Sequence, residues 1–106
     1  MDGVIRASYI GGMPYRWWPA TLAALIGIEP WEALEALNAD RRLPRSGVAL
    51  GLPVLSVWAR TAAGRPLIVV LRHEGGLDWL IVGALDMTPA QLAEFEGWEA
   101  SCRTDA

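Results

Sequence analysis

The stretch that decides the fold is residues 52–87, LPVLSVWARTAAGRPLIVVLRHEGGLDWLIVGALDM. It contains three runs rich in β-branched and aromatic residues, a composition typical of strands. Ala62–Ala63–Gly64 separates the first two runs and places glycine where a left-handed residue is needed, while Gly75–Gly76 suits a tight primed turn. The spacing predicts a three-stranded antiparallel meander. Its strands are expected within 52–61, 65–74 and 77–87.

The middle run is apolar without a break from Leu67 to Leu71. A strand with this pattern is buried on both faces of its sheet, because a half-exposed strand alternates apolar and polar residues. The predicted helices can cover one face. The other face then needs cover from the N-terminal segment, from a dimer mate or from a partner protein.

The segment after the meander carries a helix start signal. Thr88 is the expected cap, Pro89 the first helical residue, and Gln91 completes a Thr-x-x-Gln capping box. Leu92, Phe95 and Trp98 follow and offer an apolar edge to the sheet. A C-terminal helix is therefore predicted.

Two short helices are predicted before the meander. Pro19 and Pro30 each stand at a first helical position, and Gly27 ends the first helix. Residues 41–53 are punctuated by Gly and Pro and predict a loop, whereas residues 4–10 predict a short strand or extended arm. The expected fold is one α+β domain over residues 1–106: two short helices, an antiparallel meander with the N-terminal segment as a fourth strand, and a C-terminal helix.

Composition narrows the function classes. A length of 106 residues is that of one domain, and 53% hydrophobic residues exceeds the usual content of about 45–50%, so part of the apolar surface is expected to face another chain. A net charge of −3 argues against a broad nucleic-acid surface.

The sequence also bears on where the protein is located. A single cysteine and the lack of a signal peptide indicate a cytoplasmic protein. Apolar runs far shorter than the roughly 20 residues of a membrane helix predict no membrane association.

Metal and cofactor motifs are missing from the sequence. His73 and Cys102 are the only histidine and cysteine, too few for a zinc site, and no Gly-rich phosphate loop precedes a helix. We therefore expect neither a metal nor a cofactor. His73 is either a general base or phosphate contact, or an ordinary residue at a strand end. Alternation along the strand places it on the opposite face from Arg72.

The basic residues are more informative, because all nine are arginine. One group stands at predicted strand ends and one in the predicted loop. Metal-free cleavage of RNA can use positioned cations to stabilise the pentacoordinate phosphate, with an acid/base pair to move protons. Ordinary surface solubilisation is the alternative role. The strand-end group is Arg60, Arg65 and Arg72, and the loop group is Arg41, Arg42 and Arg45.

Residues 64–99, together with 30–45 (PWEALEALNADRRLPR) and 56–65 (SVWARTAAGR), resemble the BrnT group of the RelE-like ribonuclease toxins. The resemblance implies a metal-independent endoribonuclease that works by attack of the 2′-hydroxyl on the neighbouring phosphate. It makes Arg60 and Arg65 the first choices for phosphate contacts, because they lie in the best-matched hairpin, with Arg72 next and His73 as a proton-transfer group. Arg41, Arg42 and Arg45 become candidate RNA contacts. The implied partner is a small antitoxin encoded alongside, usually a dimeric DNA-binding protein that covers the toxin's active face.

The sequence departs from the family pattern at two places, and these departures leave other functions open. Leu85 follows Ala84 where the family has arginine, and residues 23–28 (AALIGI) stand where it has a Lys-His segment. One alternative is therefore a non-catalytic interaction protein of the same fold, alone or as a homodimer. Another is an excisionase-like helix-turn-helix DNA-binding module at residues 21–44. Its recognition helix would present Glu32 and Glu35 to phosphates that repel them.

Overall fold

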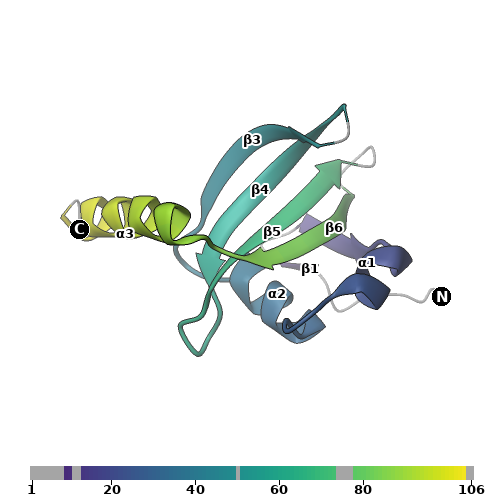
Figure 1. Ribbon diagram of the computed structural model, residues 1–106, viewed down its shortest axis with the longest axis horizontal. Coiled ribbons are helices and arrows are strands. Elements are labelled where there is room, and N and C mark those ends of the chain that lie inside the picture. The colour runs from purple at the N-terminus through teal and green to yellow at the C-terminus, as the bar shows by residue number, and fades with distance from the viewer. Residues whose placement is uncertain (1–8, 11–12, 50, 74–77, 105–106) are drawn as a thin grey trace.

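Six strands form one mixed sheet in the computed structural model, which describes residues 9–10, 13–49, 51–73 and 78–104 (Figure 1). The chain is α+β, as predicted. The strand order is β1-β2-β6-β5-β4-β3. The strands are β1 (Tyr9–Ile10), β2 (Met13–Trp17), β3 (Leu43–Ala49), β4 (Leu52–Arg60), β5 (Pro66–His73) and β6 (Trp79–Asp86). The helices are α1 (Pro19–Ala24), α2 (Pro30–Leu37) and α3 (Pro89–Thr104).

The predicted meander is confirmed. β4 pairs antiparallel with β5, and β5 pairs antiparallel with β6. Gly64 closes the first hairpin with a φ of 94°, the left-handed conformation for which glycine was expected. The predicted turn at Gly75–Gly76 lies outside the described residues. So do residues 4–8 of the predicted N-terminal strand, of which Tyr9–Ile10 forms β1.

The prediction of a loop at residues 41–53 was wrong. Residues 43–49 form β3, which pairs antiparallel with β4 from Leu43 opposite Trp58 to Ala49 opposite Leu52. Gly51, with a φ of 77°, lies in the turn between these strands. The strand LPRSGVA escapes pattern analysis because it is an exposed edge strand: backbone hydrogen bonds to β4 hold it, and it buries no alternating apolar row.

A second strand was also missed. β2 pairs parallel with β6, from Tyr15 opposite Trp79 to Trp17 opposite Ile81. Its pairing partner lies more than sixty residues away along the chain, so no local signal marks it. This parallel pair makes the sheet mixed and places α1, the helix that directly follows β2, beside β6, whereas α2 packs against β4 and β5.

The helix predictions are confirmed at their starts. α1 and α2 begin at Pro19 and Pro30, and Gly27 between them has a φ of 74°. α3 begins at Pro89. The Thr88 N–H donates to Gln91 Oε1 at 2.8 Å and the Gln91 N–H donates to Thr88 Oγ1 at 3.2 Å, which is the predicted capping box.

The two faces of the sheet are covered unequally. On the first, the covered face, alternate residues of β4, β5 and β6 such as Val57, Val69 and Ile81 pack in one core with α2. On the second, the open face, Trp58 and Ile68 are the buried residues among those that the structure describes, and they form a small cluster with Phe95 of α3. The predicted burial of the middle strand, β5, is confirmed. Successive residues of β5 alternate between the two hydrophobic cores: Val69 packs in the first and Ile68 in the second. Figure 1 shows α3 projecting from one end of the sheet, so this helix covers only that end of the open face.

Candidate functional site

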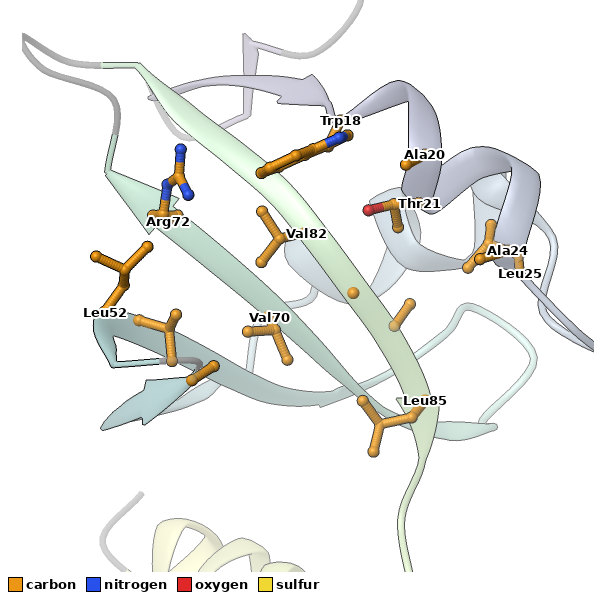
Figure 2. Close-up of a pocket in the computed structure, with 14 residues that line it drawn as sticks. Trp18, Ala20, Thr21, Ala24, Leu25, Leu52, Val70, Arg72, Val82 and Leu85 are labelled. Carbon is orange, nitrogen blue, oxygen red and sulfur yellow. The ribbon is translucent and has the colours of Figure 1, made fainter.

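An apolar groove of about 700 Å³ lies on the open face, beside α1 (Figure 2). The middle of the sheet forms its floor, α1 with the preceding Trp18 lies along one side, and residues next to the β3–β4 turn lie along the other. Nearly all of its lining side chains are apolar. They are Trp18, Ala20, Thr21, Ala24, Leu25, Ala49, Leu52, Val54, Val70, Arg72, Val82, Gly83, Ala84 and Leu85.

A β-bulge shapes the floor of this groove. The pairing of β5 with β6 shifts between Val70 and Leu71, whose partners are Gly83 and Ile81, so Val82 is an extra residue in β6. Ile81 is fully buried in the core on the covered face, whereas Val82 and Gly83 both line the groove. Bulges of this kind redirect side chains and are over-represented near functional sites. Because of the bulge, the extra residue Val82 and its neighbour Gly83 both lie on the groove side of β6.

The polar groups of the groove lie on one strand and one helix. Arg72 of β5 places its guanidinium carbon 5.3 Å from the centre of the Trp18 ring, a cation–π contact. Two further described lining residues carry a polar group: Thr21 of α1 has a hydroxyl, and Trp18 has its indole N–H. Arg72 therefore supplies the positive charge of the groove.

A second hollow of about 620 Å³ adjoins the first and shares Leu52, Val54 and Arg72 with it. His73 and Trp79 also line it, with their ring centres 4.9 Å apart. Arg72 and His73, which strand alternation alone would separate, thus both border this hollow at the end of β5. Arg72 stands where the two hollows meet.

The other strand-end arginines lie at the opposite end of β5. Arg65 and Arg72 are seven positions apart in the sequence, a span of about 23 Å on an extended strand. Arg60 and Arg65 therefore flank the first hairpin, while Arg72 and His73 lie near the far end of the sheet. The structure does not bring the four predicted catalytic residues into one cluster.

Carboxylates hold both hairpin arginines. Arg60 donates from Nε and Nη2 to the two oxygens of Glu99 in α3, each at 2.9 Å. The pKa of Arg60 is raised above its ordinary value, chiefly by this hydrogen bond. Arg65 donates to both oxygens of Asp86 at 3.1 Å and to Glu32 of α2 at 3.0 Å. In this structure these arginines connect helices and strands.

The three arginines predicted as RNA contacts also occupy different places. Arg42 donates from Nη1 to the carbonyl oxygen of Leu37 at 2.8 Å and so satisfies the end of α2. Arg45 pairs with Glu94 of α3 and lies 5.0 Å over the Trp58 ring. Arg41 is exposed. The prediction that they bind RNA stays a prediction.

Leu85, which stands where the toxins that the sequence resembles have arginine, lines the groove. Its side chain is 43% exposed, and Figure 2 places it at the end of the groove away from Arg72. Leu85 pairs with Ile68, four positions before Arg72 on β5, so the two positions are separated by about 13 Å. An arginine here would face the same groove as Arg72.

Sequence reasoning named Arg72 and Leu85 but missed the rest of the groove. Trp18, Thr21, Val82 and Gly83 carry no motif and come from two segments that are far apart in the sequence. One signal did point to it: the apolar excess and the doubly apolar middle strand predicted a sheet face that needs cover. The open face is that surface, and its uncovered part is the groove.

Neither a search of the structure for metal sites and membrane-spanning helices nor comparison with known proteins assigns a function to the chain. Within the described part of the chain, no three His, Cys, Asp or Glu side chains gather as a metal site would require. None of the helices in that part combines the length and apolarity that crossing a bilayer demands. No model of a known protein family matches the chain, and no curated protein matches it. The function must therefore be argued from the α+β fold and from the groove on its open face.

Proposed function

We propose that this chain is the toxin-like component of a toxin–antitoxin pair and that its role is to bind a protein partner through the open face. The observation that carries the proposal is the apolar groove, which the helices in the described part of the chain leave uncovered. Contiguous exposed apolar surface of this kind marks binding sites in folded proteins. The resemblance described above supplies the identity of the partner, a small antitoxin encoded next to this chain.

The arrangement of the arginines favours binding over RNA cleavage. Stabilising a phosphorane requires several donors that converge on one point a hydrogen-bond length away. Arg60 and Arg65 instead meet Glu99, Asp86 and Glu32. Arg72 is the cation of the groove, and Leu85 occupies the position at which the family pattern has arginine. The proposed role is therefore non-catalytic.

The groove also has the character of a protein interface. Interface centres are depleted in charge and rich in aromatic and aliphatic side chains. Trp18, Leu52 and Leu85 fit this description and are 39%, 46% and 43% exposed. Arg72 at the end of the groove resembles the arginine anchors that concentrate binding energy at such surfaces.

The proposal is tested by co-expressing the chain with the product of the adjacent gene and purifying the complex through a tag on the chain. We expect the complex to form and to be lost in Val70→Glu, which puts a charge on the groove floor. Leu22→Glu is the matched control, because it puts the same charge at an exposed apolar residue of α1 that does not line the groove. A complex that survives Val70→Glu would contradict the proposed surface.

Endoribonuclease activity is the second candidate, and one observation favours it. Leu85 and Arg72 line the same groove, so a single substitution, Leu85→Arg, would place two cations there. Tightly controlled induction of the chain in bacteria, beside the Leu85→Arg variant, separates the two candidates. We expect the unsubstituted chain to leave growth unchanged. Growth arrest by both proteins would overturn the non-catalytic role, whereas arrest by Leu85→Arg alone would show a toxin fold disarmed at one position.

A further inference from the structure

The outer edge of β3 is the long open edge of the sheet in the described part of the chain. β3 is the last strand in the sheet order and has β4 as its neighbour (Figure 1). Its residues from Pro44 to Ala49 are all exposed. An edge strand presents N–H and C=O groups on which another strand can pair, and charged side chains are a common means of preventing this. Arg45 is the one charged residue of β3, and it already pairs with Glu94 of its own chain.

The pairing of β3 with β4 shows which backbone groups of β3 face outward. Successive residues of an antiparallel strand alternate between those that bond to the neighbouring strand and those whose N–H and C=O point away from it. Pro44 has no N–H, and proline is placed in edge strands with that position facing solvent. Ala49 and Leu52 close the turn between the strands as a hydrogen-bonded pair, which gives the same alternation. Ser46 and Val48 therefore direct both backbone groups outward.

This edge is complementary to itself. If two copies of β3 run antiparallel with their Ser46 residues opposite each other, the whole length of both strands is paired. The two Ser46 residues then exchange N–H···O bonds in both directions, and the Val48 N–H of each copy donates to the Pro44 carbonyl of the other. The Val48 side chain, which is 74% exposed in the single chain, packs on Pro44 of the second copy.

Charge and overlap favour this register over its neighbours. With the Ser46 residues on the two-fold axis, Arg45 lies opposite Gly47 of the second copy, so the two arginines are not opposed. A shift by two residues in one direction sets Arg45 opposite Arg45, and like charges directly opposite each other destabilise a strand pair. The same shift in the other direction sets Gly47 opposite Gly47, pairs fewer residues and loses the contact between Val48 and Pro44.

From these observations we propose that β3 is a homodimer interface, in which two copies pair antiparallel about Ser46 and their six-stranded sheets become one continuous sheet. The interface is isologous, so it closes after two copies. Its two-fold axis is perpendicular to the sheet, so both open faces lie on the same side. This inference goes beyond the proposed function, because it concerns a second copy of the chain and uses the edge of the sheet, not the groove.

Sedimentation velocity of the purified chain, from about 5 to 500 µM, tests the proposal. Interfaces smaller than about 1,200 Å² are weak, and a single strand pair is of this kind, so we expect a dimer with a Kd of about 10–100 µM. A chain that stays monomeric over the whole range would overturn the proposal.

Variants of the edge test the pairing itself. Ser46→Pro removes an outward N–H without removing a bond to β4, and should weaken the dimer at least about tenfold. Val48→Lys should also weaken it, because lysine on an edge opposes pairing. Ile26→Lys is the matched control: it replaces an apolar residue that is 89% exposed and lies outside the sheet, and it should leave the Kd unchanged. Circular dichroism establishes that each variant is folded, and an unchanged Kd for both edge variants would refute the interface.

The groove is the other surface on which copies could meet. Val70→Glu, the variant that tests the proposed function, should leave the dimer unchanged. A dimer that is lost in Val70→Glu but kept in Ser46→Pro would place the interface in the groove and contradict pairing at β3. These measurements use the chain alone, so failure of the dimer and failure of partner binding are separate results.

Cross-linking tests the register. Paired residues that exchange hydrogen bonds have Cα atoms about 5.5 Å apart, so a short bismaleimide should join two copies of Ser46→Cys across the axis. Cys102, the single cysteine, is replaced by serine in this experiment. Ser101→Cys, at an exposed position of α3, is the control and should remain monomeric on denaturing gels. Covalent dimer from Ser101→Cys without any from Ser46→Cys would refute the proposed pairing.

Discussion

Breaking the Arg60–Glu99 pair distinguishes a structural arginine from one kept for RNA. The two side chains form a bidentate ion pair with both N···O distances at 2.9 Å, and they join the end of β4 to α3. Arg60 also donates to the carbonyl oxygen of Gly64 at 3.0 Å and lies 5.6 Å over the Phe95 ring. If these contacts fix α3 on the sheet, then removing either partner must destabilise the folded chain.

The size of the effect follows from exposure. The Glu99 side chain is 15% exposed and that of Arg60 is 32% exposed, so the pair lies between a buried and a surface ion pair. Hydrogen bonds to charged groups contribute about 1.5–3 kcal/mol, and fully exposed pairs contribute about 0.2–1 kcal/mol. We expect Arg60→Gln and Glu99→Gln each to lower the free energy of unfolding by about 1.5 kcal/mol. Their coupling should be about 1 kcal/mol.

The assay is a double-mutant cycle measured by urea unfolding, which isolates the Arg60–Glu99 term from the other contacts of Arg60. Arg16 and Asp78 provide the reference pair. Their closest N···O distance is 3.7 Å and their side chains are 50% and 47% exposed, so their coupling should not exceed about 0.5 kcal/mol. A coupling below about 0.3 kcal/mol for Arg60–Glu99 would refute the structural role and return Arg60 to the candidate phosphate contacts.

Three further predictions concern stability. Burial raises the pKa of Tyr15 above 10.0, so the unfolded chain loses its phenolic proton first and the free energy of unfolding should fall as pH rises beyond 10.0; Tyr15→Phe should flatten this dependence in urea titrations, and an unchanged slope would argue against it. Thr88→Ala removes the side-chain cap of α3 and should lower the free energy of unfolding by about 1 kcal/mol. An unchanged melting temperature would show that the cap does not stabilise the helix. Gly97→Ala, at an exposed position within α3, should raise stability by about 0.5–1 kcal/mol; a lower melting temperature would contradict an open environment at Gly97.

Local signals in the sequence were the ones that predicted structure correctly. The capping box at Thr88 and Gln91 and the proline at the start of each helix act within one helical turn, so a few residues suffice to specify them. The β4–β5 hairpin likewise depends on Gly64 and the runs beside it. The β2 and β3 strands were missed because their pairing is set by tertiary contacts: β2 meets β6 across most of the chain, and β3 exposes nearly all of its side chains.

The candidate site was less predictable for a physical reason. Arginine type and spacing show which side chains can contact phosphate, but the partners of Arg60 and Arg65 lie 39 and 21–33 residues away in the sequence. Only the folded chain shows that those charges are matched by carboxylates. The bulge at Val82 is equally invisible in the sequence, because an apolar strand with one extra residue has the same composition as a regular strand.

Position 85 decides which chemistry the open face offers. Leucine there continues the aliphatic floor of the groove. Arginine would put a second cation about 13 Å along the same groove and would suit a polyanion such as RNA. The fold is compatible with both residues, because the Leu85 side chain is 43% exposed and its strand pairing to Ile68 uses backbone atoms alone. Leu85→Arg is therefore expected to keep the fold and to raise the affinity of the chain for RNA, which a binding assay at low salt would measure; an unchanged affinity would contradict the effect of charge at this position.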